Sequence, residues 1–182
     1  MSRIILVRHG RAAAGWDADI DPGLDAVGHA QAEAMCGELA PKGPLPIVVS
    51  PLRRTRETAA ALERAWDAIA VVEPALGEIP APVDDLAARA AWIRGVLAGE
   101  WAGQADELRR WRGEVIAALL ALDRNTVAVS HFVAINVAVG AATADDRVVS
   151  FLADHCSQTV LDNDGGFLQL VQLGASASTP VL

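Results

Sequence analysis

The sequence contains a single lysine, Lys42, and neither of the common glycine-rich nucleotide-binding loops. A phosphate loop of the Gly-x-x-x-x-Gly-Lys-Ser/Thr type requires a lysine that this chain does not supply in the right place. The Gly-x-Gly-x-x-Gly pattern of dinucleotide-binding domains does not occur either. These two absences disfavour nucleoside triphosphate hydrolysis and dinucleotide-dependent chemistry.

Cysteine is also scarce, because Cys36 and Cys156 are the two residues of this type. Their spacing matches no metal motif, and each lies in an apolar stretch, so we expect buried, reduced thiols in a cytoplasmic protein. His29 and His155 lack the spacing of metal ligands, although His155 directly precedes Cys156. We therefore expect no metal and no other cofactor.

Long apolar runs and excess positive charge are missing as well. No apolar run reaches the about 18 residues that a membrane helix requires, and no N-terminal signal precedes the first predicted strand. The net charge of −8 disfavours a nucleic-acid surface, which normally needs a basic stripe. We expect neither a membrane nor a nucleic acid as a partner, and we leave homodimer formation open.

The first segment with a chemical signature is at the N-terminus. Residues 4–7 form an apolar run, typical of a strand buried on both faces of a parallel sheet, and Arg8, His9 and Gly10 follow it. Ligands of open α/β sheets bind beside the carboxyl ends of the strands, and a glycine there allows a sharp turn. Taken alone, the Arg-His pair could also merely cap a strand.

Residues 46–50 repeat the pattern of an apolar run followed by a polar residue, Ser50, and an arginine-rich helix follows them. Ser50 is a good N-cap and Pro51 suits the first helical position. Three arginines fall in the first two turns: Arg53, Arg54 and Arg56. Cations are unfavourable at a helix start, so this pattern indicates an anion that binds from outside. The alternative is that two of the three pair with Glu57 and Glu63 on a solvated face.

A third short, mainly apolar strand is predicted over residues 125–131; it ends in His131, and a helix is predicted over residues 132–142. The carboxyl ends of parallel strands meet at one edge of a sheet, so we expect His9, His131 and the arginines to converge there. A neutral imidazole can attack phosphorus, and arginine matches phosphate oxygens in a bidentate way. The combination predicts phosphoryl transfer.

Together these segments resemble the histidine phosphatase superfamily, the phosphoglycerate mutase-like phosphatases, over most of the chain. Four motifs occur in the order of that family: Arg-His-Gly at 8–10, Ser-Pro-Leu-Arg-Arg at 50–54 with Thr-Ala at 58–59, Leu-Gly-Glu at 76–78, and Val-Ser-His at 129–131. A single Arg-His-Gly has little specificity, whereas four motifs in order and spacing are specific.

The resemblance implies roles for five residues. His9 is phosphorylated, Glu78 is the general acid and base, and the phosphoryl group is bound by Arg8, Arg54 and His131. It implies a metal-independent phosphomonoester hydrolase of the histidine acid phosphatase type, with a small phosphorylated compound as its substrate. Two alternatives stay open: a phosphomutase of the same superfamily, and a non-catalytic binder of phosphorylated ligands.

The chain departs from the family pattern in three segments. Residues 11–14 (Arg-Ala-Ala-Ala) replace the acidic or amide residue and the hydroxyl residue that often follow the first motif. Residues 79–82 (Ile-Pro-Ala-Pro) replace a frequent aromatic-Gly-x-Trp-Glu-Gly, which makes Asp84 and Asp85 the next candidates for the acid. Phe132 stands where glycine is common, and it either narrows the pocket or points its ring elsewhere.

The pKa of Glu78 decides whether this carboxyl group can donate a proton near neutral pH. A partly apolar, proline-flanked loop would raise the pKa, whereas nearby arginines would lower it. The sequence leaves this balance open.

The rest of the chain alternates between helical and strand patterns. Helices are predicted over residues 26–39 with an Asp25 cap, 52–66, 83–97 and 105–122, a short strand over 69–72, and a terminal hairpin of 159–161 and 167–171. We predict a three-layer α/β/α sandwich with a mostly parallel central sheet and helices on both faces. Residues 1–174 suit one domain, and residues 175–182 a flexible C-terminal tail.

Overall fold

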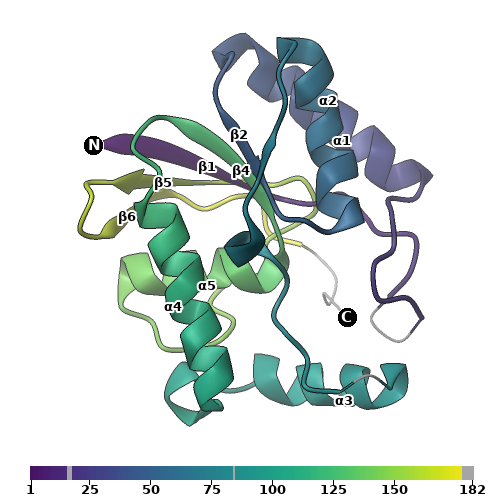
Figure 1. Cartoon of the computed structure of the whole chain (residues 1–182), viewed down its shortest axis with the longest axis vertical. Coiled ribbons are helices and arrows are strands. Elements are labelled where there is room, and N and C mark those ends of the chain that lie inside the picture. The colour runs from purple at the N-terminus through teal and green to yellow at the C-terminus, as the bar shows by residue number, and fades with distance from the viewer. Residues whose placement is uncertain (16–17, 84, 178–182) are drawn as a thin grey trace.

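A computed structural model describes residues 1–15, 18–83 and 85–177, in which five α-helices surround a sheet of six strands (Figure 1). The strands are β1 (Ser2–Arg8), β2 (Ile47–Val49), β3 (Val71–Val72), β4 (Thr126–Ser130), β5 (Gln158–Asn163) and β6 (Leu168–Gln172). The helices are α1 (Ala26–Leu39), α2 (Arg53–Trp66), α3 (Leu86–Leu97), α4 (Asp106–Leu120) and α5 (Phe132–Thr143). Three short 3-10 helices join them: η1 (Ala40–Lys42), η2 (Pro74–Leu76) and η3 (Trp101–Gly103).

The strand order explains how distant segments meet. It runs β3-β2-β4-β1-β5-β6, with parallel pairing from β3 to β1 and antiparallel pairing from β1 through β5 to β6. β4 therefore lies between β2 and β1, and the carboxyl ends of these three strands share one edge of the sheet. β5 and β6 form the predicted hairpin.

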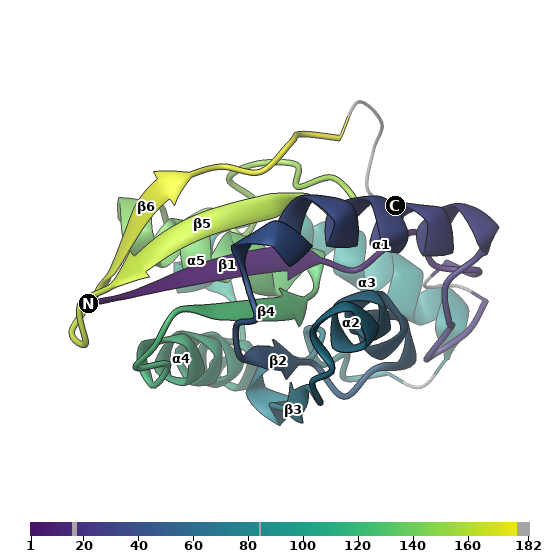
Figure 2. The ribbon, with the colours of Figure 1, turned by 90° about the horizontal axis from the view of Figure 1, so that it is seen from above.

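The side chains of β1 alternate between two hydrophobic cores, one on each face of the sheet. Ile4 and Leu6 pack with residues of α3, α4 and α5, whereas Ile5 and Val7 pack with residues of α1 and α2. Figure 2 shows α1 in front of the central strands and α5 behind them. This arrangement confirms the predicted three-layer α/β/α sandwich, because a strand buried on both faces needs helices on both sides.

The start of α1 is where the sequence predicts it. The Asp25 carboxylate accepts the backbone N–H of Gly28 at 2.7 Å, the usual contact of an N-cap. The predicted start of α2 is wrong, because this helix begins at Arg53 and not at Pro51. The hydroxyl of Ser50 lies 2.7 Å from Nε2 of His131 and accepts the N–H of Leu52 at 3.3 Å, so it joins His131 to the residue before α2 without capping the helix itself.

The state of the two cysteines and the length of the helices were expected from composition. Cys36 and Cys156 are free and buried, as predicted, and burial raises the pKa of the Cys156 thiol to about 12. Among the described residues, no helix is long and apolar enough to cross a bilayer.

The C-terminal segment runs beside the loop that precedes β5. The Ala177 N–H donates to the carbonyl of Leu152 at 2.7 Å, and Ala153 forms a bridge with Ser176. Residues 178–182 of the predicted flexible tail lie outside the described part of the chain.

The loop after β1 packs directly on the first turn of α1. A Cβ atom on Gly10 would lie 2.6 Å from the carbonyl oxygen of Gly28, and one on Gly28 would lie 2.1 Å from the carbonyl oxygen of Arg11. At Gly37, further along α1, a Cβ atom would have no atom from outside its own stretch of helix backbone within 4 Å. The close approach thus requires glycine at positions 10 and 28, and it holds the loop that carries His9 against the helix.

We predict opposite effects on stability for alanine at two glycines of α1. Gly28→Ala forces backbone atoms apart and should lower the free energy of unfolding by about 1–3 kcal/mol. Gly37→Ala, at an exposed helical position, should raise it by about 1 kcal/mol. Urea denaturation of the two variants and the parent protein measures both. Equal effects would show that the loop is not held by this contact.

Candidate active site

The three segments singled out in the sequence meet at the carboxyl edge of β1, β2 and β4. The N–H of His9 donates to the carbonyl of Ser130 at 3.0 Å, and the N–H of Ser50 donates to the carbonyl of Val129 at 3.1 Å. These bonds continue the parallel pairing beyond the strands, so the side chains that follow them lie side by side. The rings of His9 and His131 have centroids 5.2 Å apart.

His9 is held in one tautomer. Its Nδ1 lies 2.7 Å from the carbonyl oxygen of Gly10, and because a carbonyl can only accept, Nδ1 carries the proton. Burial lowers the pKa of His9 well below its ordinary value, and the cations of Arg54 and Arg8 lower it further. The ring is therefore neutral at neutral pH, and its Nε2 lone pair faces the cavity and Arg54.

Thr58 ties the loop of His9 to helix α2. Its hydroxyl oxygen accepts the N–H of Gly10 at 3.0 Å and donates to the carbonyl of Arg54, one turn earlier, at 2.7 Å. The backbone after His9 and the backbone of Arg54 are thus joined through one side chain. Thr58 belongs to the second motif, but its contact with Gly10 had no signal in the sequence.

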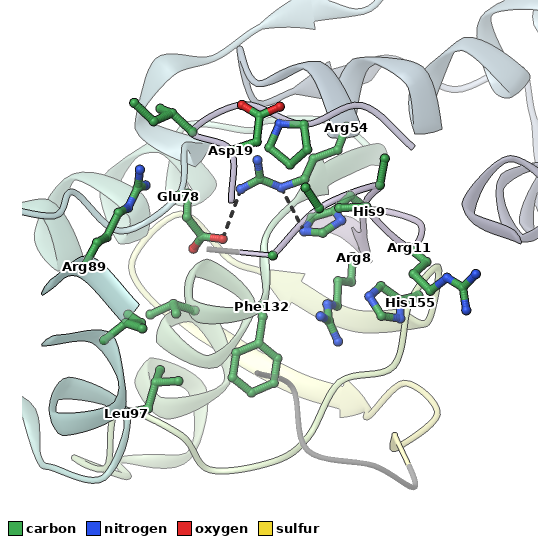
Figure 3. A pocket seen from close by; sticks show the side chains of 18 residues that line it. Arg8, His9, Arg11, Asp19, Arg54, Glu78, Arg89, Leu97, Phe132 and His155 are labelled. Atoms are coloured by element: carbon green, nitrogen blue, oxygen red, sulfur yellow. Dashed lines mark hydrogen bonds and ion pairs between the residues drawn. The ribbon is translucent and has the colours of Figure 1, made fainter. Parts of the chain in front are cut away.

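Of the three arginines at the start of α2, Arg54 points into the site. The Nε–H of Arg54 donates to Nε2 of His9 at 3.2 Å, and its Nη2 lies 3.4 Å from Oε2 of Glu78 (Figure 3). Arg53 forms an exposed pair with Glu57 at 2.7 Å, as the solvated-face alternative supposed, and Arg56 is exposed. Neighbours on a helix point about 100° apart, which explains the split.

His131 is fully buried at the start of α5. Its Nε2 lies 2.7 Å from the Ser50 hydroxyl, and its Nδ1 lies 3.4 Å from Oε2 of Glu78. Burial lowers its pKa well below the ordinary value, and His9, Arg54 and Arg8 lower it further. α5 begins at the next residue, so the positive end of the helix dipole lies beside this ring.

Glu78 reaches the site from the turn after η2, and its side chain is 6% exposed. Burial raises the pKa of this carboxyl group above its ordinary value, against the lowering influence of Arg54 and Arg8. The balance that the sequence left open is therefore decided by burial. Of the two other candidate acids, Asp85 is exposed and caps α3 through the N–H of Ala88, and Asp84 lies outside the described residues.

Arg8 approaches from the end of β1 and is also buried. Its Nη1 donates to the carbonyl of Ala153 at 2.7 Å, and its guanidinium lies 5.3 Å from the centre of the Phe132 ring. Burial lowers the pKa of Arg8 to about 10, which leaves it cationic at neutral pH. Phe132, whose orientation the sequence left open, packs under this guanidinium and lines the cavity.

The side chains surround a cavity of about 310 Å³ (Figure 3). Its lining includes Arg8, His9, Arg54, Glu78, Arg89 and His155. The guanidinium groups of Arg8 and Arg54 face the carboxyl group of Glu78 and the neutral imidazole of His9, so this part of the cavity has a net positive charge. His131 is fully buried behind these residues and is not among those that line the cavity. Such a site suits a small anion with several oxygens.

Two lining residues were not recognised from the sequence. His155, considered there only as a metal ligand, has its ring centroid 6.0 Å from that of His9, and burial and Arg8 lower its pKa to about 4. It precedes β5, whose amino end meets the carboxyl end of β1 because the two strands are antiparallel. Arg89 comes from the first turn of α3, where no local pattern points to a site.

The described residues also include one set of side chains that could approach a metal ion. Ligand atoms of His9, Glu78 and His131 lie within 4.8 Å of one another. Arg54 and Arg8 add two positive charges beside them, and Nε2 of both histidines already faces another group. This donor set therefore suits an anion better than a cation.

The amino-acid sequence matches a known protein family. The profile described as histidine phosphatase superfamily (branch 1) matches residues 4–176. Among curated protein sequences no significant match is found.

Several solved structures share the fold. A phosphoserine phosphatase from Entamoeba histolytica, in complex with 3-phosphoglyceric acid, is 20% identical with a TM-score of 0.75, over 97% of this chain and 98% of that one. A putative α-ribazole-5'-P phosphatase from Escherichia coli is 22% identical with a TM-score of 0.74, over 99% and 100%. A mycobacterial glucosyl-3-phosphoglycerate phosphatase is 23% identical with a TM-score of 0.72, over 97% and 100%.

Proposed function

The chain belongs to the histidine phosphatase superfamily (branch 1), and we propose that it hydrolyses phosphomonoesters through a phosphohistidine formed on His9. The observation that carries this proposal is the state of His9: its ring is neutral, with Nδ1–H bonded to Gly10 and Nε2 directed at the cavity beside Arg54. A neutral imidazole next to fixed cations is a competent nucleophile for a phosphate dianion.

In the first step, the Nε2 lone pair of His9 forms a bond to phosphorus while the bond to the leaving oxygen breaks. Arg8, Arg54 and His131 hold the non-bridging oxygens and offset the charge that spreads over them. Glu78 gives its proton to the leaving oxygen. The raised pKa of Glu78 supports this role, because a general acid must hold its proton near the working pH.

In the second step, the Glu78 carboxylate takes a proton from water as the water oxygen attacks phosphorus. The N–P bond breaks, inorganic phosphate leaves, and His9 returns to its neutral form with Glu78 protonated again. The positive charge for both steps comes from Arg8 and Arg54, so the reaction proposed here uses no metal ion. A cavity of about 310 Å³ suits a small phosphorylated substrate, the kind of ligand that the phosphoserine phosphatase structure contains.

The proposal is tested with p-nitrophenyl phosphate in the presence of a chelator. We expect nitrophenol and inorganic phosphate to appear in equal amounts. When the phosphoryl group of the substrate is labelled, a rapid, acid-free quench should trap the label on His9. His9→Ala should abolish turnover, and His29→Ala, at an exposed histidine of α1, should retain it. A missing phosphate product would favour transfer over hydrolysis, and activity in His9→Ala would exclude the covalent step.

Adjacent arginines of α2 offer a matched comparison. Arg54→Ala removes a preorganised donor to the phosphoryl group and should lower kcat/KM by about 100- to 1,000-fold. Arg53→Ala breaks only an exposed pair with Glu57 and should change kcat/KM by no more than about fivefold. Steady-state kinetics on p-nitrophenyl phosphate measures both variants. The reverse order would show that another arginine binds the phosphoryl group.

The role of Glu78 predicts a dependence on the leaving group. An alkyl alkoxide needs a proton and a nitrophenolate hardly does, so Glu78→Gln should lower kcat/KM about 100-fold or more on an alkyl phosphate and much less on p-nitrophenyl phosphate. This holds when formation of the phosphohistidine limits both rates. An equal loss on both substrates would mean that Glu78 orients phosphate or water instead.

The same role predicts the pH profile on an alkyl phosphate. The pKa of Glu78 is raised, and its acid form is present below that pKa, so kcat/KM should fall as pH rises through it. Glu78→Gln should remove this decline, because the amide does not titrate. A decline that persists unchanged in Glu78→Gln would assign the titration to another group.

A further inference from the structure

We propose that the aromatic ring of Phe132 is a positioning group, which holds the guanidinium of Arg8 in place for the phosphoryl group through a cation–π interaction. The inference rests on the proposed function, because it takes Arg8 to bind the phosphoryl group. It assigns a role to a residue that departs from the family pattern, since Phe132 stands where glycine is common.

Arg8 is a buried cation with little polar compensation from the protein. The residue is 5% exposed, and its Nη1 donates to the carbonyl of Ala153 at 2.7 Å. Within the described residues, its Nε has no hydrogen-bond partner and its guanidinium forms no ion pair. Arg54, in contrast, lies 3.4 Å from Oε2 of Glu78 and 3.8 Å from Oδ1 of Asp21. A buried charge without a carboxylate partner needs another source of stabilisation.

The ring of Phe132 supplies this stabilisation. Cζ of Arg8 lies 5.3 Å from the centroid of the ring, within the about 6 Å over which the negative face of an aromatic ring attracts a cation. Both residues are 5% exposed, so little water screens the attraction. Both also line the cavity (Figure 3). The ring face attracts the charge of Arg8 without accepting one of its N–H groups, so these donors stay available to phosphate oxygens.

A second arginine shows what a carboxylate partner would change. Cζ of Arg112 lies 5.5 Å from the centroid of the Trp101 ring, but Arg112 also pairs with Asp146 at 3.2 Å, and it does not line the cavity. A carboxylate beside Arg8 would fix its position too, but it would offset the positive charge and occupy the N–H donors. It would therefore compete with a phosphate dianion, whereas an aromatic ring does not.

Helix α5 fixes both groups that contact Arg8. Phe132 is the first residue of this helix, and most of the helix is buried. Asn136, one turn further along, holds the loop of residues 150–153 by accepting two of its backbone N–H groups at 2.8 and 3.0 Å. The carbonyl of Ala153 belongs to this loop. The ring and the carbonyl thus have a common support, which keeps the guanidinium in one position.

This support prepares the site before a ligand arrives. An arginine side chain that is already held in place loses less conformational freedom when an anion binds, and the anion is bound more tightly as a result. Because the ring acts on the charge of Arg8, its electron density should affect phosphate affinity, and not only its size.

The test places phenylalanine with one, two or three ring fluorines at position 132. Fluorine withdraws electrons from the ring face and changes its shape little. Calorimetric titration with inorganic phosphate measures the Kd of each variant. We expect Kd to rise with each fluorine, by about 10- to 30-fold for three, the scale of a desolvated cation–π contact. Trifluorophenylalanine at position 167 is the matched control, because Phe167 is 54% exposed and does not line the cavity, and it should leave Kd unchanged.

Phe132→Leu separates the electronic effect from the effect of shape. It keeps an apolar side chain without an aromatic face, and it should weaken phosphate binding about as much as three fluorines do. A Kd that stays constant across the fluorine series would overturn the proposal even if Phe132→Leu binds phosphate weakly, because the ring would then act through its shape alone. A Kd that falls with each fluorine would also overturn it, since the ring face would then repel the anion.

Stability without ligand distinguishes this inference from the proposed function. Urea denaturation of the parent protein and of Arg8→Met, each with and without trifluorophenylalanine at position 132, forms a double-mutant cycle. Fluorination should raise the unfolding equilibrium constant about 10-fold more in the parent protein than in Arg8→Met. Equal effects in the two backgrounds would refute the contact even in an active phosphatase. Unequal effects in a protein that binds no phosphate would support the contact and refute the proposed function.

Discussion

The guanidinium of Arg54 joins the two groups on which the proposed reaction depends. Its Nε–H donates to Nε2 of His9 at 3.2 Å, and its Nη2 lies 3.4 Å from Glu78. The position of Arg54 follows from α2, and Thr58, one turn further along this helix, binds the backbone N–H that follows His9. A shift of α2 against β1 would therefore displace the proposed nucleophile, the proposed acid and the anion site together.

Burial and charge together decide the protonation states in this site: both lower the pKa of His9 and His131, whereas they act in opposite directions on the pKa of Glu78. Burial keeps His9 and His131 neutral and raises the pKa of Glu78, while Arg8, with a pKa of about 10, stays cationic at neutral pH. A phosphate dianion that enters the cavity meets fixed positive charge and a carboxyl group whose pKa is raised. Because these side chains are largely buried, each of these interactions is stronger than it would be in solution.

The cavity has two parts with different origins. The phosphoryl part is built from residues at the ends of β1, β2 and β4 and the first turn of α2, which the core holds from both faces of the sheet. The other part is lined by Arg89 and Leu97 of α3 and by the loop after β1. Such a division lets a rigid sheet edge carry the chemistry while surrounding segments set the substrate.

The amino-acid sequence was enough to predict the main elements and their shared edge, because apolar runs that end in His9 and His131 indicate parallel strands, and such strands bring their ends together. The four ordered motifs added Glu78. Three outcomes needed the folded chain: Ser50 binds His131 and does not cap α2, His155 lies beside His9, and burial raises the pKa of Glu78. These outcomes depend on which distant segments meet and how much water they exclude, and local sequence patterns do not contain that information.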